Sequence, residues 1–414
     1  MAHSEKEEQS EQVESVTPTK ISFLKADNET GEWQNLYIEP ESETSPQDQD
    51  QAQREVSASH KQLSEYLHSV LTTSNLVILA GSGTSLGRAR GPSMKDLWNK
   101  AANLQDFQNV CSAVNHQSGD NWIENLLSRC RMAKEFFNTE DTNNTNKMVN
   151  SFLSEAEKMI WEVCSKFLEV ADLSDHEIFF RRMARRRLRA PRLKLFTTNY
   201  DLCFEKAAGN LGIVVIDGFS FSQPRRFDPR FFNYDVVRRA TTSDESHDFV
   251  EGVIQIFKLH GSVNWDKKNH GIIQNEKPEV PCLIYPTSTK YEQSYSQPHL
   301  EMMSQFQTTL REPNTCLVTI GFGFNDNHLL APVLAAINSN PSFKLLVIDP
   351  SAKSKSEQAS GVYLTLREKI AGGEADITML NAEFGQFVKL IPHLRALSPA
   401  EQIERSVKQI ARES

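Results

Sequence analysis

Apolar and polar positions alternate along the chain in a way that predicts strands separated by helices. Short, nearly unbroken apolar runs are bounded by turn residues, as expected of parallel strands buried on both faces. They lie at residues 76–80, 193–197, 213–216, 253–259, 282–285, 315–320 and 343–348. Helical segments between them complete an alternation that predicts an α/β fold with a Rossmann-like, doubly wound, mainly parallel sheet.

The region from about residue 105 to residue 190 shows helical spacing and no strand pattern. Trp122, Leu126 and Leu127 belong to one segment, and a longer segment extends from Phe152 to Val170. We therefore expect a helical insertion, or small domain, within the α/β body. Shortly before it, Ser93 is followed three residues later by an acidic residue, a pattern that predicts a capped helix start.

The two ends of the chain differ from this body in composition. Residues 1–58 are rich in Glu, Gln, Ser and Asp, which predicts a polar and partly flexible N-terminal arm. Within the arm, residues 21–24 and 33–38 are expected to be short strands or docking segments, and residues 41–54 a flexible linker. A helix should then begin near Ser59. Residues 351–414 are expected to form a C-terminal α/β and helical extension, whose last helix opens at residues 398–401.

Charge and cysteine content exclude several classes of function. The formal net charge is −9, so no overall basic character attracts the chain to nucleic acid. No window reaches the roughly 20 apolar residues of a membrane span, and the N-terminus lacks the apolar core of a secretory signal. The six cysteines form no C-x-x-C pair, which excludes a local zinc or redox motif of that kind. We expect a cytoplasmic protein with reduced thiols and no membrane contact.

A dense group of arginines lies between Arg181 and Arg192. Such a group is consistent with a solvated helix face that pairs with acidic neighbours. It is also consistent with a surface that binds phosphate groups or an acidic partner. No aromatic residues are interleaved with the arginines, so stacking on bases has no support. Both interpretations remain open at the level of sequence.

A glycine-rich segment follows the apolar run at residues 76–80. Gly81, Gly83 and Gly87 give the pattern G-x-G-x-x-x-G, one residue longer than the usual dinucleotide fingerprint. In open α/β sheets such a turn holds a pyrophosphate on free backbone N–H groups. The alternative is an ordinary tight turn between a strand and a helix. Taken alone, the segment does not decide between them.

Polar or glycine-containing groups follow five of the predicted strands. They are Gly81–Ser85, Asn199 with Asp201, His260 with Gly261, Gly321–Phe324, and Asp349. Ligands of open α/β sheets bind outside the carboxyl ends of the strands, so these groups are expected to meet in one cleft. This joint placement is far more specific than the glycine segment alone.

The order of these segments and their residues resemble the motifs of the sirtuin family. The matching pieces are Gly-Ser-Gly-Thr-Ser (81–85), Thr-Thr-Asn-Tyr-Asp (197–201), Leu-His-Gly-Ser (259–262), Gly-Phe-Gly (321–323) and Leu-Val-Ile-Asp (346–349). The resemblance covers roughly residues 60–350. It implies a SIR2-like NAD-binding domain over residues 59–350, with NAD⁺ as the substrate.

The resemblance also implies a role for each matching residue. The NAD phosphates would be cradled by Gly81, Ser82, Gly83, Thr84 and Ser85, and the adenosine half would be lined by Gly321, Gly323 and Asp349. Asn199 would position the nicotinamide ribose or an attacking water, Asp201 would help hold the nicotinamide pocket, and His260 would be the general base. From the residues alone, other roles stay open: Asp201 as a helix cap, His260 as a core histidine, and Asp349 as a strand-end turn.

Two departures from the family's protein deacylases change the expected activity. Residues 86–94 do not match their GIPDFR-like segment, and the four zinc cysteines in two C-x-x-C pairs are absent, so no metal is expected. The pattern is similar to the sirtuin-type effectors of bacterial antiphage systems, which cleave NAD to nicotinamide and ADP-ribose. A single domain with short flanks is most similar to the sirtuin subunit that pairs with a HerA-type ATPase.

That resemblance implies a homo-oligomer with a hexameric HerA-type ATPase as partner. Nucleic acid would be contacted only through the partner or through Arg181–Arg192. Three alternatives remain: a non-catalytic sensor of NAD or ADP-ribose that gates a partner, an NAD-dependent protein deacylase, and a nucleic-acid-binding module.

Overall fold

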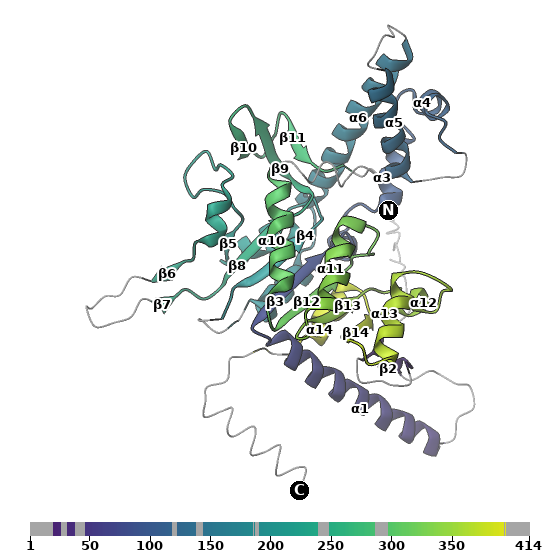
Figure 1. The fold of residues 1–414 in the computed structure, drawn as a ribbon, viewed down its shortest axis with the longest axis vertical. Coiled ribbons are helices and arrows are strands. Elements are labelled where there is room, and N and C mark those ends of the chain that lie inside the picture. Colours follow the sequence, from purple (N-terminus) through teal and green to yellow (C-terminus); the bar gives the residue numbers. More distant parts are fainter. Residues whose placement is uncertain are drawn as a thin grey trace, which may run out of the picture.

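The central feature of the molecule is one long twisted sheet. The computed structural model describes residues 20–25, 31–37, 46–117, 122–137, 144–184, 186, 190–238, 248–285, 297–392 and 394. Within these residues the main sheet has the strand order β2-β1-β14-β13-β12-β3-β4-β8-β5 (Figure 1). Its strands are β1 (Ser22–Leu24), β2 (Gln34–Asn35), β3 (Asn75–Ala80), β4 (Leu193–Thr197), β5 (Val214–Ile216), β8 (Val253–Lys258), β12 (Thr315–Ile320), β13 (Lys344–Ile348) and β14 (Asp376–Asn381).

Neighbouring strands from β14 to β5 are parallel, whereas β1 pairs antiparallel with both β14 and β2. Every residue of β3, β8 and β12 is buried, which explains why these strands are mainly apolar. The strand order changes direction at β3: β4 and β8 lie on one side of β3, and β12, β13 and β14 lie on the other. The predicted mainly parallel α/β fold is confirmed.

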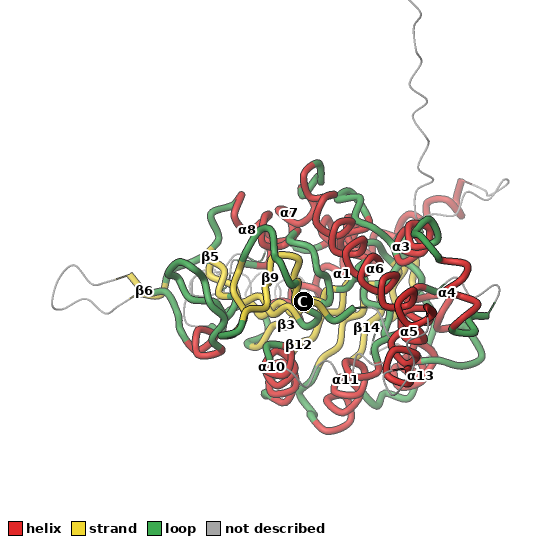
Figure 2. The backbone as a smooth tube through the Cα atoms, turned by 90° about the horizontal axis from the view of Figure 1, so that it is seen from above, coloured by secondary structure: helices red, strands yellow, loops and turns green. Residues whose placement is uncertain are grey.

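Helices cover both faces of this sheet. One layer contains α1 (Pro46–Leu71), α7 (Ser174–Met183), α8 (Cys203–Asn210) and α14 (Phe384–Leu390). The other contains α10 (His299–Arg311), α11 (Asn327–Ser339), α12 (Ala352–Ser356) and α13 (Val362–Ala371). Figure 2 shows α7 and α8 on one side of the strands and α10 and α11 on the other. Two separate apolar cores result, one under each layer, as in other doubly wound folds.

A helical bundle projects from one end of the molecule (Figure 1). It consists of α3 (Met94–Ala101), α4 (Phe107–Ala113), α5 (Ile123–Phe137) and α6 (Asn144–Lys166), which is followed by the 3₁₀ turn η1 (Phe167–Glu169). The capping box predicted at Ser93 is present, with Asp96 as its second member. The bundle has its own core, whereas Phe179 and Phe180 of α7 pack against the main sheet. Packing therefore groups α3–α6 around one core and places α7 with the main sheet.

Two smaller sheets lie beside the main one. The first is antiparallel and contains β9 (Gly261–Lys268), β10 (Gly271–Gln274) and β11 (Pro281–Leu283). The strand predicted at residues 282–285 belongs to this sheet and not to the parallel one. The second pairs β6 (Val237–Arg238) with β7 (Asp248–Phe249), after the 3₁₀ segment η2 (Pro229–Asn233). β9 was not predicted because it is mostly polar. Its buried Asp266 is accommodated by hydrogen bonds from Asn275 and the Val280 N–H.

The structure also corrects the prediction at both ends. Helix α1 begins at Pro46, so residues 46–54 are helical and not a linker; their Gln, Ala and Arg residues have a high helix propensity. Residues 21–24 match the short strand β1. Strand β14 was missed because Thr378 interrupts its apolar run, although that side chain is buried. The helix expected at residues 398–401 lies outside the described residues.

None of the helices in the described part of the chain is long and apolar enough to cross a membrane. All six cysteines lie in described segments, and each is a free thiol.

Candidate active site

Five adjacent strands of the main sheet end in the residues that the sequence singles out. In spatial order these are β13 with Asp349, β12 with Gly321 and Gly323, β3 with Gly81–Ser85, β4 with Asn199 and Asp201, and β8 with His260. The five strands are parallel, so their carboxyl ends lie along one edge. Segments up to 268 positions apart in the chain (349 − 81) are thus brought to one side of the molecule.

The turns after β3 and β12 touch each other. The N–H of Gly81 donates to the carbonyl of Ile320 (2.9 Å), and the N–H of Gly83 donates to the carbonyl of Gly321 (3.1 Å). A Cβ added at Gly81 would lie 2.5 Å from the Gly321 carbonyl oxygen, and Gly321 itself has a φ of +58°. Glycine is therefore needed here for the close approach of two backbones. The reason is internal to the protein and does not depend on a ligand.

The backbone donors of the first turn already have protein partners. Thr84 and Ser85 donate their N–H groups to the carbonyls of Gly81 and Ser82 as the chain enters α2 (Gly83–Leu86). Four of the five N–H groups assigned by resemblance to the NAD phosphates are thus bonded to carbonyl oxygens in this structure. The hydroxyl groups of Thr84 and Ser85 are buried and face a different partner.

That partner is Asn199, whose amide is fixed by these two hydroxyls. Its Nδ2 donates to Thr84 Oγ1 and to Ser85 Oγ, at 3.0 Å in each case. The Thr84 hydroxyl donates its hydrogen to the Gly81 carbonyl, and the Ser85 hydroxyl donates its hydrogen to the Asp201 carboxylate. Both hydroxyl oxygens can therefore only accept from Asn199. The two N–H bonds of the amide are therefore used, and Oδ1 is the atom that Asn199 can offer to a hydroxyl or a water.

Asp201 anchors this network. Its Oδ2 accepts from Ser85 Oγ at 2.8 Å, and its Oδ1 accepts from the backbone N–H of Cys203 at the start of α8. The carboxylate thus has both the helix-end role and the site role that the sequence left open. Burial, with the Asp201 charge as a further cause, raises the pKa of the Cys203 thiol, so this cysteine is a neutral, inert neighbour.

A buried ion pair lies beneath the end of β4. Lys258, the last residue of β8, donates to the Asp201 carbonyl and pairs with Glu205 Oε1 at 3.2 Å. The lysine side chain is only 3% exposed. Burial raises the pKa of Glu205, and the lysine charge opposes that shift. The pair ties α8 and the Asn199 loop to β8, directly ahead of His260. Sequence reasoning missed both residues, although a lysine at the end of an apolar strand was a visible signal.

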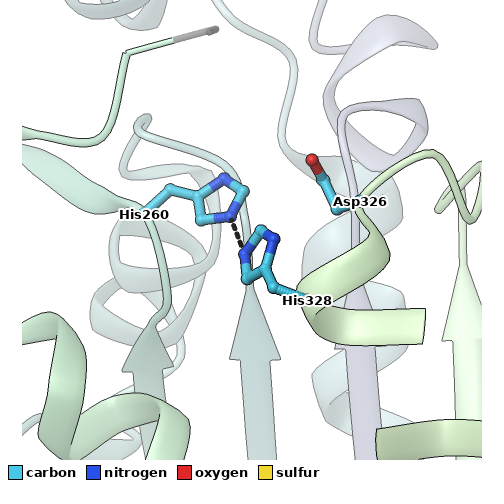
Figure 3. Close-up of side chains that lie close together, drawn as sticks. All are labelled: His260, Asp326 and His328. Carbon is cyan, nitrogen blue, oxygen red and sulfur yellow. Dashed lines mark hydrogen bonds between the residues drawn. The ribbon is translucent and has the colours of Figure 1, made fainter. Parts of the chain in front are cut away.

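His260 meets a second histidine at the end of β8. Its Nε2 lies 3.1 Å from Nε2 of His328, which belongs to the first turn of α11 (Figure 3). Asp326, the N-cap residue of α11, lies beside the two imidazole rings. One ligand atom from each of the three side chains lies within 4.8 Å of the others. Both histidines are buried, at 4% and 7% exposure. The sequence alone assigned no site role to Asp326 or His328.

Asp349 is in a different situation at the end of β13. Its Oδ1 accepts from the Ser351 N–H (2.7 Å), and its Oδ2 accepts from Lys355 Nζ (2.8 Å) and from the Tyr363 hydroxyl. Burial, together with the Asp349 charge, raises the pKa of Tyr363, so the phenol stays a donor. Both carboxylate oxygens are bonded within the chain, and the strand-end turn left open by the sequence is present.

The described arginines of the Arg181–Arg192 group serve mainly structural roles. Arg182 donates to the carbonyls of Lys389 and Ile391, and Arg186 donates to those of Leu71, Thr73 and Ser74. Arg192 pairs with Asp235 at 2.8 Å. These contacts favour the interpretation that the arginines donate to carbonyls at helix ends and pair with acidic neighbours.

One family model and several solved structures are similar to this chain. Residues 194–367 match the family model described as a SIR2-like domain. Among solved structures, the chain is similar to the complex of a SIR2 homolog with NAD, at 12% identity and a TM-score of 0.42, over 80% of this chain and 93% of that one. It is also similar to a mutant Sir2 homologue bound to ADP-ribose, at 13% identity and a TM-score of 0.41, over 80% and 95%.

No curated protein matches the chain. The family match begins in β4 and ends in α13, so it includes Asn199, Asp201, His260 and Asp349 but not the turn after β3. The match to the SIR2-like domain model is thus limited to residues 194–367.

Proposed function

We propose that this chain hydrolyses NAD⁺ to nicotinamide and ADP-ribose. The observation that carries the proposal is the placement of Asn199 and His260 at the ends of the neighbouring strands β4 and β8. The SIR2-like domain supports NAD-linked chemistry in general, and these two positions match the family motifs quoted above. The loss of the deacylase motifs favours water, rather than an acetyl-lysine, as the acceptor.

The reaction breaks the bond between C1′ of the nicotinamide ribose and the ring nitrogen. Nicotinamide leaves as a neutral molecule because its ring is already cationic, and positive charge develops at C1′. The water oxygen then bonds to C1′, and the proton that the water loses passes to His260. NAD⁺ and water thus give nicotinamide, ADP-ribose and one proton. Asn199 Oδ1, held by the amide bonds to Thr84 and Ser85, would orient the ribose hydroxyl or the water.

Asp201 contributes by positioning rather than by contact with substrate. Its two oxygens hold Ser85 and the start of α8, and Ser85 in turn holds Asn199. The acceptor atom of Asn199 is therefore set before substrate arrives, which removes an ordering cost from the reaction.

The rest of NAD would extend along the ends of β3, β12 and β13. The phosphates would pass the contact between the Gly81 and Gly321 turns, whose glycines let the two backbones approach each other. Since the Gly81, Gly83, Thr84 and Ser85 N–H groups have partners, phosphate binding through them would require the turn to open. A ribose hydroxyl near Asp349 would have to share the carboxylate with Lys355 and Tyr363.

In its wider role, we propose the chain as the effector of an antiphage, abortive-infection complex with a hexameric HerA-type ATPase. Unrestrained NAD loss would kill the host cell, so partner binding or homo-oligomer assembly would have to control the activity. The N-terminal arm (residues 1–58) is a candidate contact. If its removal leaves the assembly size unchanged, as measured by light scattering, the arm has no such role.

The test incubates the purified full chain with NAD, alone and with the ATPase partner, and quantifies nicotinamide and ADP-ribose by mass spectrometry. In water labelled with ¹⁸O, hydrolysis places one labelled oxygen on the ADP-ribose. Equal amounts of both products in any condition support the proposal. NAD binding without product in every condition contradicts it and favours a sensor, and product that forms only with an acetylated peptide favours a deacylase.

A further inference from the structure

The three side chains His260, Asp326 and His328 converge from two separate elements on one point (Figure 3). We propose that they bind a Zn²⁺ ion. The expectation of no zinc rested on missing C-x-x-C cysteine pairs. The set found here contains no cysteine and stands elsewhere, at the carboxyl edge of the main sheet.

The donor set suits zinc. Two imidazole nitrogens and one carboxylate oxygen are ligands that Zn²⁺ accepts, and three protein ligands leave a fourth position for water or another molecule. Two nitrogens bound to one tetrahedral zinc ion lie about 3.3–3.4 Å apart, given Zn–N bonds of about 2.0–2.1 Å. The Nε2 atoms of His260 and His328 are 3.1 Å apart, so a small rotation of either ring makes room for the ion.

The backbone already holds these ligands in place. The segment around His260 is fixed on both sides, because the Leu259 N–H donates to the Thr197 carbonyl and the Ile284 N–H donates to the His260 carbonyl, both at 2.8 Å. Asp326 accepts the N–H groups of Leu329 and Leu330 on its own carbonyl at the start of α11. Little chain ordering would therefore accompany binding, and the buried histidines would gain charge compensation from Asp326.

The alternative occupant of this position is a proton. In the absence of an ion, one imidazole donates to the other, which gives a hydrogen-bonded histidine pair. A metal ion and this shared proton exclude each other, because both use the Nε2 lone pairs. Measuring metal binding directly separates the two cases.

The ion would also act on the proposed reaction, and this part rests on the proposed function. His260 Nε2 cannot hold Zn²⁺ and accept a proton from water at the same time. Bound Zn²⁺ is therefore expected to restrain NAD cleavage, which would supply one source of the control that such an activity requires.

The test titrates Zn²⁺ alone into the metal-free full chain by calorimetry, and records the visible spectrum with Co²⁺ as a substitute. We expect about one ion per chain and the intense visible bands of four-coordinate Co²⁺. His328→Ala and Asp326→Asn should each weaken binding at least about tenfold, with folding checked by circular dichroism. His270→Ala, in the exposed turn between β9 and β10, is the matched control and should bind as the wild type does.

Absence of stoichiometric binding, or binding that neither site variant weakens, overturns the metal site. In wild-type protein that cleaves NAD, added Zn²⁺ should lower nicotinamide release, and a chelator should restore it; unchanged release at saturating Zn²⁺ overturns the restraint. If Zn²⁺ binds as described and NAD is never cleaved, the metal site stands and the proposed function fails.

Discussion

Asn199 and Asp349 occupy equivalent positions, each just past the end of a parallel strand, yet their surroundings differ. Two hydroxyls from the neighbouring turn hold the Asn199 amide nitrogen, and its oxygen remains to be offered. Asp349 is bonded on both oxygens by residues that follow it in the chain: Ser351, Lys355 and Tyr363. We propose that the first arrangement orients a group for an incoming molecule, whereas the second completes a local turn.

From this contrast we infer that a strand-end position alone does not define a ligand contact. What distinguishes the two ends is where the hydrogen-bond partners come from. Partners from another strand's loop, as at Asn199, join segments into a site, and partners from the next helices, as at Asp349, stabilise the fold. The following predictions test that distinction, from the largest expected effect to the smallest.

The stability of the region at the end of β4 should depend strongly on the ion pair between Lys258 and Glu205. Replacing Lys258 with Met leaves the partly buried Glu205 without its partner, which should lower the free energy of unfolding by about 2–3 kcal/mol. Urea denaturation measures the loss. The double variant Lys258→Met with Glu205→Leu removes both charges and should recover most of it; equal losses in the single and double variants would mean that the pair is not coupled.

Low pH should destabilise the folded protein by protonating His176 of α7. This residue lies between Phe204 and Phe384, its ring nitrogens are among the buried atoms without a hydrogen-bond partner in the described residues, and burial lowers its pKa from 6.5 to about 4. His176 therefore binds a proton more tightly in the unfolded chain than in the folded protein. The contribution of neutral His176 to the free energy of unfolding is complete above pH 6.5 and is lost as the pH falls toward 4. The loss amounts to about 3 kcal/mol.

The variant His176→Phe should lose correspondingly less stability over this pH range, as followed by thermal unfolding at each pH. Wild type and variant with parallel stability curves would show that His176 titrates normally in the folded protein.

At the β13 end, Tyr363→Phe should affect folding and not catalysis. The variant removes a buried hydrogen bond to a carboxylate, which should cost about 2 kcal/mol of stability. The KM for NAD should stay within about threefold of the wild-type value. An unchanged melting temperature with a tenfold change in KM would instead make Asp349 part of the nucleotide contact and remove the contrast with Asn199.

Ser85→Ala should have the smallest effect and act on catalysis. The change deletes the hydroxyl that joins Asn199 to Asp201, so the amide is oriented less well, and kcat should fall about tenfold with little change in KM. Steady-state kinetics separates the two constants. A rise in KM with unchanged kcat would assign Ser85 to ground-state binding of NAD.

The sequence predicted the parts of this molecule that depend on local patterns. Buried parallel strands are mainly apolar, and their carboxyl ends lie along one edge, so the sequence could place Asn199 and His260 on the same edge of the sheet. Strand β14 was missed because Thr378 breaks its run, and β9 because its buried polar residues find partners only in the folded chain.

Side chains that come from unrelated elements were beyond such reasoning. His328 lies 68 positions from His260, on a helix whose orientation the sequence does not define. Likewise, nothing in the arginine group reveals that Arg186 donates to backbone carbonyls near the end of α1. These contacts depend on three-dimensional packing and not on spacing along the chain.

The most direct test of the account measures NAD binding and nicotinamide release on the same samples of wild type and Asn199→Ala. We predict that the wild type binds and cleaves NAD, and that the variant still binds NAD within about tenfold while its cleavage rate falls on the order of 10³-fold. Equal cleavage by both proteins would contradict the central claim that the end of β4 orients the reacting ribose.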